Sequence, residues 1–146
     1  MRFVDTNILV YSLDLGPTQP EKSAIALEIL SQTDIALSVQ VLQEFYVQAT
    51  HPRRPDALPH DLAERFIQKW LRFRIQENTL AVFQSALNLK LRLPVSFRDA
   101  SILAAAKAAG CRQLLTEDLN HGQDYDGVVA VNPFLSAAKE QSGQNS

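Results

Sequence analysis

The sequence predicts an α/β fold built around a mainly parallel central sheet. Short apolar runs of strand type, at residues 35–39, 113–115 and 128–132, alternate with longer segments whose apolar residues recur at helical spacing. The chain of 146 residues has the length of one domain, and a hydrophobic content of 46% is sufficient for a sizeable core. We therefore expect a single domain over residues 1–138, followed by a polar, disordered tail over residues 139–146.

The composition narrows the class of protein. A formal net charge of −2 gives no general attraction to nucleic acid, so phosphate binding has to rely on local Arg and Lys side chains or on metal ions. The single cysteine, Cys111, excludes an intramolecular disulfide, and neither a secretion signal nor a membrane-spanning run is evident. We expect a soluble, cytoplasmic protein with no membrane partner.

The chain begins with a strand-like run and a helical segment. Residues 2–12 are apolar with β-branched members, which is typical of a strand buried on both faces. Turn residues follow, and a capping box from Thr18 to Glu21 is expected to start a helix there. The apolar side of this helix is predicted to carry Ala24, Leu27 and Leu30.

The next segment contains a short strand, a helix and the clearest loop. Residues 35–39 predict a strand, and residues 39–51 predict a helix. Residues 51–60, HPRRPDALPH, contain three prolines and form a loop between helices. The apolar side of the predicted helix consists of Leu42, Phe45, Tyr46 and Ala49.

Two further helices are expected after the proline-rich loop. We expect them to form a hairpin, because no clear strand separates them. The first is predicted by the spacing of Leu62, Phe66, Trp70 and Leu71. The second is predicted by the spacing of Leu80, Phe83, Leu87 and Leu91.

The last third of the chain predicts a helix and two strands. Residues 96–110 have a serine start signal, an alanine-rich body and a glycine just beyond the end, which together predict a complete helix. QLLTED and VVAVN then predict short strands on either side of a loop, residues 120–127.

Four acidic residues stand at the ends of these predicted elements. Sites in an open α/β sheet form at the carboxyl ends of the strands and in the loops that follow. Two of the acids follow strand-like runs, and the other two lie near the starts of helices, next to apolar residues. The four residues are Asp5, Glu44, Asp99 and Asp118.

Each acid also has a purely structural interpretation. Asp99 fits the last position of a capping box opened by Ser96, and Glu44 could extend from a helix edge into solvent. Asp5 and Asp118 could be turn residues that accept hydrogen bonds from nearby backbone amides. A single acid therefore proves little. The convergence of all four acids on one edge of the sheet would be a much stronger indication of a functional site, because it would otherwise require four coincidences.

Convergence of the four carboxylates would favour a metal site. Like-charge repulsion would raise their pKa values and destabilise the site, and a divalent cation removes that conflict. Oxygen ligands favour Mg²⁺ or Mn²⁺, which bind through carboxylates together with substrate phosphate. A metal ion held in this way implies metal-assisted phosphodiester hydrolysis. The sequence agrees with it, since it contains no Gly-rich phosphate loop, no GxSxG motif and no CxxC pair.

The segments that contain these acids resemble those of a PIN domain, the ribonuclease fold of VapC-type toxins in toxin-antitoxin pairs. They are DTNILVY, VLQEFY, FRDASILAAA and LLTEDLNHGQ, which occur in the family order and cover nearly the whole chain. The resemblance implies a three-layer α/β/α domain and a metal-dependent endoribonuclease. Its cofactor would be Mg²⁺, with Mn²⁺ as a substitute.

The resemblance also assigns roles to individual residues and partners. Asp5, Glu44, Asp99 and Asp118 match the acidic quartet, with Asp5 and Asp99 as direct ligands and the other two as direct or water-mediated ligands. The residues that match the family's supporting polar positions are Thr6, Asn7 and Thr116. The implied partners are an RNA substrate, a small antitoxin protein that blocks the site, and a second copy of the chain in a homodimer.

One basic residue is placed at the proposed site by its position alone. Arg98 precedes Asp99, and we expect it to hold substrate phosphate or an acidic group of an incoming partner. A catalytically inactive scaffold that binds nucleic acid or protein is the alternative to the nuclease. The nuclease predicts that Asp5→Asn abolishes cleavage while keeping or raising stability in metal-free buffer, because one repulsive charge is removed.

Overall fold

The structure, a computed structural model, describes residues 1–13 and 19–135 and is built on one twisted sheet. Across these residues the sheet has six strands in the order β3-β2-β1-β4-β6-β5. The neighbouring pairs are parallel except β5 and β6, which are antiparallel. The strands are β1 (Arg2–Val4), β2 (Ile35–Ser38), β3 (Arg74–Gln76), β4 (Gln113–Leu115), β5 (Asp124–Tyr125) and β6 (Val128–Val131).

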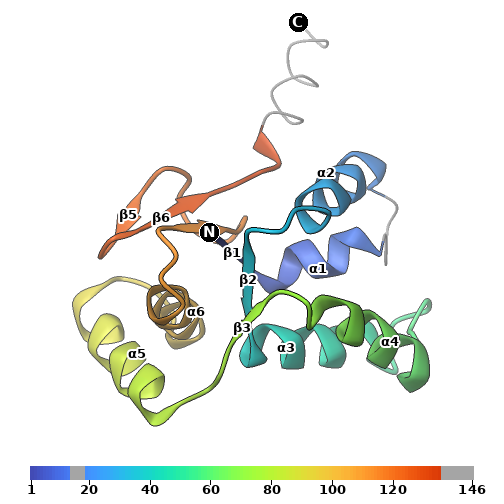
Figure 1. Cartoon of the computed structure of the whole chain (residues 1–146), viewed down its shortest axis with the longest axis horizontal. Helices are drawn as coiled ribbons and strands as arrows, with labels where there is room; N and C mark the ends of the chain where they lie inside the picture. Colours follow the sequence, from blue (N-terminus) through green and yellow to red (C-terminus); the bar gives the residue numbers. More distant parts are fainter. Residues whose placement is uncertain (14–18, 136–146) are drawn as a thin grey trace, which may run out of the picture.

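Helices cover both faces of the sheet, which confirms the predicted α/β fold. Figure 1 shows α1 to α4 on one side and α5 with α6 on the other. None of the helices in the described part of the chain is long and apolar enough to cross a membrane. The helices are α1 (Thr6–Ser12), α2 (Pro20–Leu30), α3 (Val39–Ala49), α4 (His60–Trp70), α5 (Leu80–Arg92) and α6 (Phe97–Ala108).

The prediction of one strand across residues 2–12 is wrong, because the run divides at Asp5. β1 ends at Val4, and α1 begins at Thr6. The carboxylate of Asp5 caps α1 by accepting a 2.7 Å hydrogen bond from the Thr6 amide. Because α1 packs against both α2 and α3, its residues are buried nearly all round, and such a helix has the same apolar composition as a buried strand.

α2 is confirmed as a helix, but of the three residues predicted on its apolar side only Leu30 is buried. Ala24 and Leu27 are exposed, Leu27 by 55% of its surface. Both possible sides have apolar residues at helical spacing, so packing against α1 decides which one is buried. Pro20 is the first helical residue, and Thr18 of the predicted capping box lies outside the described residues. The residues that face the core are Ala26, Ile29 and Leu30.

The expected helical hairpin after the proline-rich loop is wrong, because β3 separates its two helices. β3 lies at the edge of the sheet and pairs with β2, Ala36 opposite Arg74 and Leu37 opposite Ile75. Its sequence, RIQ, has a single apolar residue, so it lacks the composition from which a strand can be predicted. The chain crosses the sheet edge here, and α4 and α5 pack on opposite sides (Figure 1).

α5 is confirmed as a helix, but the predicted apolar side faces outward. The helix packs against α6 through Val82, Ala86 and Leu89, which are buried. The residues predicted to be buried are exposed: Leu80 by 71%, Phe83 by 50%, Leu87 by 49% and Leu91 by 87%. α5 therefore has apolar residues on both sides, and only one side has a partner in the described part of the chain.

The carboxyl-terminal elements follow the predictions, with one strand added. α6 begins after Ser96, whose hydroxyl accepts a hydrogen bond from the Asp99 amide, and Gly110 beyond its end has a φ of +79°. The predicted loop at residues 120–127 contains β5, which pairs with β6 through a two-residue Asp126-Gly127 turn. The tail at residues 139–146 and the boundary at residue 138 lie outside the described residues and stay predictions.

Candidate metal-binding and catalytic site

The carboxyl ends of β1 and β4 bring Asp5 and Thr116 into contact. Val4 lies opposite Leu115 in the parallel register, and the Asp5 amide donates a 3.0 Å hydrogen bond to the Leu115 carbonyl. The residue that follows β4, Thr116, donates its hydroxyl to Oδ2 of Asp5 at 2.8 Å. Both side chains are buried, so these contacts fix the position of the Asp5 carboxylate.

β2 and α3 bring Glu44 to the same edge. Ser38 ends β2 and caps α3, its hydroxyl accepting a hydrogen bond from the Val41 amide at 3.2 Å. Glu44 lies in the second turn of α3, where Thr6 Oγ1 donates to its Oε1 at 3.0 Å. The side chain of Glu44 is 25% exposed, so it is mostly covered and does not extend into solvent.

The remaining two acids reach the edge from α6 and from the segment after β4. Asp99 lies in the first turn of α6 and is 19% exposed, whereas Asp118 is 51% exposed. The Asp118 amide donates to Thr116 Oγ1 at 3.1 Å, and Asn7 Nδ2 donates to Asp118 Oδ2 at 3.4 Å. The structure thus brings together the four predicted acids and their three predicted supporting residues.

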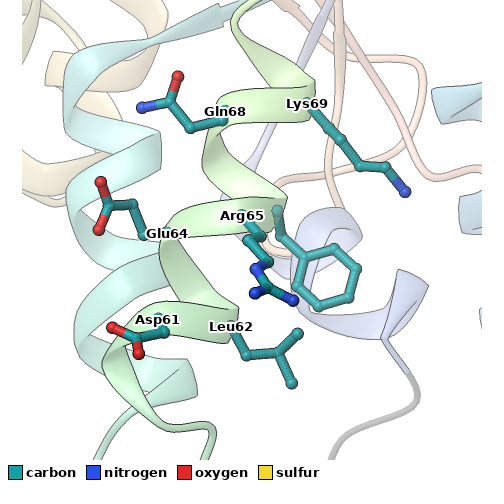
Figure 2. Close-up of a pocket in the computed structure, with 7 residues that line it drawn as sticks. Asp61, Leu62, Glu64, Arg65, Gln68 and Lys69 are labelled. Carbon is teal, nitrogen blue, oxygen red and sulfur yellow. The ribbon is translucent and has the colours of Figure 1, made fainter.

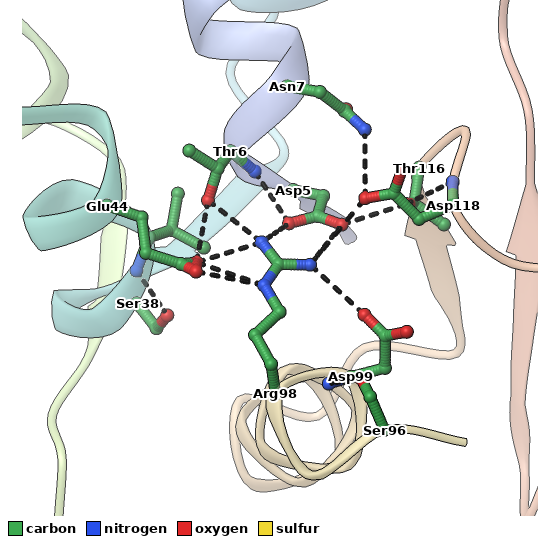
Figure 3. Close-up of polar contacts among 11 residues, drawn as sticks. Asp5, Thr6, Asn7, Ser38, Glu44, Ser96, Arg98, Asp99, Thr116 and Asp118 are labelled. Atoms are coloured by element: carbon green, nitrogen blue, oxygen red, sulfur yellow. Dashed lines mark hydrogen bonds and ion pairs between the residues drawn. The ribbon is translucent and has the colours of Figure 1, made fainter. Parts of the chain in front are cut away.

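Arg98 lies at the centre of this group, as Figure 3 shows. Its guanidinium contacts a carboxylate oxygen of each of the four acids, at shortest distances of 2.6 Å for Asp5, 2.8 Å for Glu44, 3.2 Å for Asp99 and 3.7 Å for Asp118. The Arg98 side chain is 32% exposed. Sequence position placed Arg98 at the site, but nothing in the sequence indicated that it would point inward.

The charges of the cluster shift the pKa values of two of its members. Burial lowers the pKa of Arg98, but hydrogen bonds to Glu44 and Asp5 outweigh burial and hold that pKa above its usual value. Burial and then repulsion by Asp5 raise the pKa of Asp118, and Arg98 only partly opposes them. A cation is therefore favoured at the centre, while the ionised form of Asp118 stays disfavoured beside it.

The structural interpretations of single acids turn out to be compatible with a shared site. Asp5 caps α1 through the Thr6 amide and also binds Arg98. The Asp99 amide is capped by Ser96, while its carboxylate contacts Arg98. The backbone contacts hold each acid in place, and the side-chain oxygens remain directed at one cation.

The donor set fits a divalent cation in its chemistry. Carboxylate, hydroxyl and amide oxygens are the ligands that Mg²⁺ and Mn²⁺ prefer. The buried Oδ1 of Asn7 has no hydrogen-bond partner among the described residues, so one oxygen acceptor at this edge is left for a further donor or cation. Within residues 1–13 and 19–135, no three His, Cys, Asp or Glu side chains are arranged to hold a metal ion as they stand. The guanidinium fills the position at which they would converge.

A further acidic residue, Glu117, lies beside the four acids of the site and was not predicted from the sequence. Glu117 precedes Asp118, accepts a hydrogen bond from Tyr11 and forms a 3.0 Å ion pair with Lys22. These contacts join α1 and α2 to the segment after β4, so they hold the backbone from which Asp118 projects. Glu117 and Asp118 are neighbours in the TED motif, and this adjacency is the sequence feature from which a role for Glu117 could have been predicted.

A cavity of about 800 Å³ lies elsewhere, along α4 (Figure 2). Its lining includes Asp61, Leu62, Arg65 and Phe66, and all of its lining residues belong to this one helix. None of the four acids contributes to it. A surface formed by one helix without convergent polar groups from other elements lacks the features of a catalytic site, so we place the chemistry at the acids.

Comparison with known proteins identifies a family. A family model described as PIN domain matches residues 2–123 of the chain. The matched region contains the four acids and Arg98, and it extends from β1 to the segment before β5. No curated protein sequence matches the chain.

Several solved structures share the fold. A toxin-antitoxin complex from Klebsiella pneumoniae is 22% identical with a TM-score of 0.65, over 91% of this chain and 98% of the matched one. FitAcB from Neisseria gonorrhoeae is 21% identical with a TM-score of 0.66, over 92% and 99%. VapC20 from Mycobacterium tuberculosis, a sarcin-ricin loop cleaving toxin, is 19% identical with a TM-score of 0.61, over 81% and 92%.

Proposed function

We propose that the chain, which belongs to the PIN domain family, is a metal-dependent endoribonuclease that hydrolyses RNA phosphodiester bonds. One observation carries the proposal: four carboxylates from four separate elements surround a single cation at the carboxyl edge of the sheet. Sites in open α/β sheets form at this edge. A purely structural ion pair would need one acid, not four.

The proposed ligands of a divalent cation are Asp5, Glu44, Asp99 and Asp118. When bound there, Mg²⁺ or Mn²⁺ would activate water for attack on phosphorus and neutralise charge on the leaving oxygen. Thr116 and Thr6 donate hydrogen bonds to Asp5 and Glu44, so they fix which carboxylate oxygens face the centre. Asn7 orients Asp118 in the same way.

A toxin role within a toxin-antitoxin pair is supported by the similar structures. One of them is a toxin-antitoxin complex, and another is a toxin that cleaves the sarcin-ricin loop. A small antitoxin would silence this protein by covering the acidic edge. Asp118, half exposed at the rim, is then among the first groups that such a partner meets.

A homodimer is the assembly that we propose, through the outer side of α5. This side is an apolar stripe, defined as Leu80, Phe83, Leu87 and Leu91, and every member is at least 49% exposed. Phe97, at the start of α6, packs edge to face with Phe83 and is 40% exposed, so it extends the stripe. A stripe of this spacing pairs with a copy of itself across a two-fold axis.

The alternative is a PIN scaffold that binds a partner without turnover. Its support is that Arg98 already neutralises part of the acidic cluster, so the acids have a structural role without any metal. The two functions differ in one respect. Only the nuclease requires both the Asp5 carboxylate and a divalent cation for cleavage.

Cleavage of a mixed pool of structured RNAs tests the proposal. Purified protein, shown to be folded and free of inhibitor, is compared with Asp5→Asn in EDTA, Mg²⁺ and Mn²⁺. We expect cutting only with a metal ion and only by the unaltered protein. Asp126→Asn is the matched control, because it makes the same change on the surface hairpin and should cut normally. Absence of cutting with every metal ion would favour the scaffold.

A further inference from the structure

The guanidinium of Arg98 is fully engaged within the acidic cluster. Nη2 donates to Asp5 Oδ1 at 2.6 Å, to Glu44 Oε1 at 2.8 Å and to Thr6 Oγ1 at 3.1 Å. Nη1 donates to Asp5 Oδ2 at 3.1 Å and to Asp99 Oδ1 at 3.2 Å. Nε donates to both carboxylate oxygens of Glu44, the shorter distance being 2.9 Å. All three nitrogens therefore bind oxygens that the proposed function assigns to a metal ion.

The guanidinium and a divalent cation cannot use these oxygens together. Mg²⁺ binds oxygen at about 2.0–2.1 Å, so an ion shared by Asp5 and Glu44 would lie within the space that Nη2 fills. Two cations at such short range also repel each other strongly in a partly buried site. Binding of one requires withdrawal of the other.

We infer that Arg98 is an internal counter-cation, which holds the four carboxylates in the metal-free protein and withdraws when a divalent cation binds. The inference rests on the proposed function, because it concerns the same ligands. It explains how acids this close together fold without a metal ion. It also makes the apparent metal affinity equal to the intrinsic affinity multiplied by the fraction of molecules in which Arg98 has withdrawn.

The surroundings of Arg98 allow that withdrawal. The residue lies at the second position of α6, where its side chain is 32% exposed and has a flexible aliphatic stem. It also lines a cavity of about 410 Å³ between α5 and the site, together with Asn78, Phe83 and Ser101. A withdrawn guanidinium stays at the rim of the acidic cluster, where it would meet a substrate phosphate, which is one of the two roles expected for it from the sequence.

Divalent-cation binding by four proteins tests the inference. Mn²⁺ affinity is measured by titration calorimetry for the unaltered protein, Arg98→Gln, Arg98→Lys and Arg92→Gln. Arg98→Gln should bind Mn²⁺ about tenfold or more tightly, because the competing cation is gone. Arg98→Lys keeps the charge but loses the forked hydrogen bonds, so it should also bind more tightly, by a smaller factor. Arg92→Gln removes an arginine from the surface pair with Asp126 and should change nothing.

A second measurement needs no substitution, in case Arg98→Gln fails to fold without metal. In the metal-free protein the Arg98 Nε–H should give a protected side-chain resonance in ¹⁵N NMR spectra, because Nε binds Glu44. Addition of Mg²⁺ should shift this resonance and speed its exchange with water.

The outcomes separate the inference from the proposed function. If the unaltered protein binds the metal ion while the Arg98 resonance stays protected and Arg98→Gln binds no more tightly, the inference is wrong and the nuclease proposal stands. If the Mn²⁺ affinity rises in Arg98→Gln but not in Arg98→Lys, the effect of Arg98 is only long-range charge repulsion, and this result also overturns the inference. If no protein binds a divalent cation, both ideas fail.

Discussion

Arg98 binds Asp5 through two parallel contacts, Nη2 to Oδ1 at 2.6 Å and Nη1 to Oδ2 at 3.1 Å, although 93 positions separate the residues in the chain. This geometry is the bidentate pairing in which a guanidinium binds a carboxylate most strongly. The Asp5 side chain is 2% exposed, so the pair is largely withdrawn from water on the aspartate side. The contact joins the first strand of the sheet to α6.

The pairing reverses one expectation for Asp5→Asn. From the sequence we expect the substitution to keep or raise stability in metal-free buffer, because it removes a repulsive charge. In the structure it removes charged hydrogen bonds to Arg98, so we now predict a loss of about 1–3 kcal/mol in the free energy of unfolding. Urea denaturation in EDTA measures it, and an unchanged or raised stability would contradict the pairing.

Asp118→Asn should behave in the opposite way. Its side chain is 51% exposed and contacts Arg98 only at 3.7 Å. Burial and the charge of Asp5 raise the pKa of Asp118, so its ionised form is disfavoured in the fold. A neutral side chain of the same shape should therefore raise stability slightly in metal-free buffer at pH 7. The same denaturation experiment checks it, and a loss as large as that of Asp5→Asn would exclude this explanation.

Two leucines of α2, predicted to share one apolar side, differ in their burial. Leu30 is 6% exposed, and Leu30→Ala should lower the free energy of unfolding by about 2–5 kcal/mol, since it leaves a cavity in the core. Leu27 is 55% exposed, and Leu27→Ala should change stability by no more than about 0.5 kcal/mol. Thermal and chemical denaturation of the two variants give the comparison. Equal losses would mean that Leu27 is buried as well.

The apolar stripe on α5 predicts the effect of charge on assembly. Leu87→Glu combined with Leu91→Glu should convert a dimer into a monomer, because two charges would face each other across the two-fold axis. Light scattering after gel filtration reports the mass. Leu27→Glu is the control, since it places a charge at an equally exposed leucine outside the stripe. A monomeric unaltered protein, or a dimer that survives the double substitution, would show that α5 is not the interface.

Asp126 predicts how stability depends on pH. Arg92 and Lys107, at 2.9 and 2.5 Å, hold the pKa of Asp126 well below its usual value of 3.8 through hydrogen bonds. A lowered pKa in the folded state stabilises the protein above the unfolded pKa, and this contribution is lost as the pH falls through the folded pKa. Asp126→Asn should therefore be less stable than the unaltered protein at pH 7.

The stability difference caused by Asp126→Asn should shrink as the pH falls below 3.8, and it should also shrink at high salt because the pairs are exposed. Asn accepts the positive φ of 58° at this position, so the substitution leaves the turn unstrained. Urea denaturation at a series of pH values from 7 down to 2 measures the difference. A difference of the same size at every pH would assign the effect to the turn and not to charge.

The sequence predicted elements well where composition and local chemistry agree. The helix from Phe97 to Ala108 has an alanine-rich body, with its serine cap and its terminal glycine close by in the sequence, and β2 begins with three apolar residues. The predictions failed where a neighbour decides the outcome. β3 has one apolar residue because it is an edge strand, and α1 resembles a strand because it is buried nearly all round.

By itself, the sequence determined the fold class and the identity of the four acids, since strand composition and the position of an acid after an apolar run are local properties. Tertiary structure alone decided the direction of Arg98. A side chain next to Asp99 can point to solvent or inward, and the inward position is favoured because β1, α3 and α6 deliver the oxygens of Asp5, Glu44 and Asp99 to one point. Tertiary structure also decided which side of α5 is exposed, because α6 covers only the side that carries Val82 and Leu89.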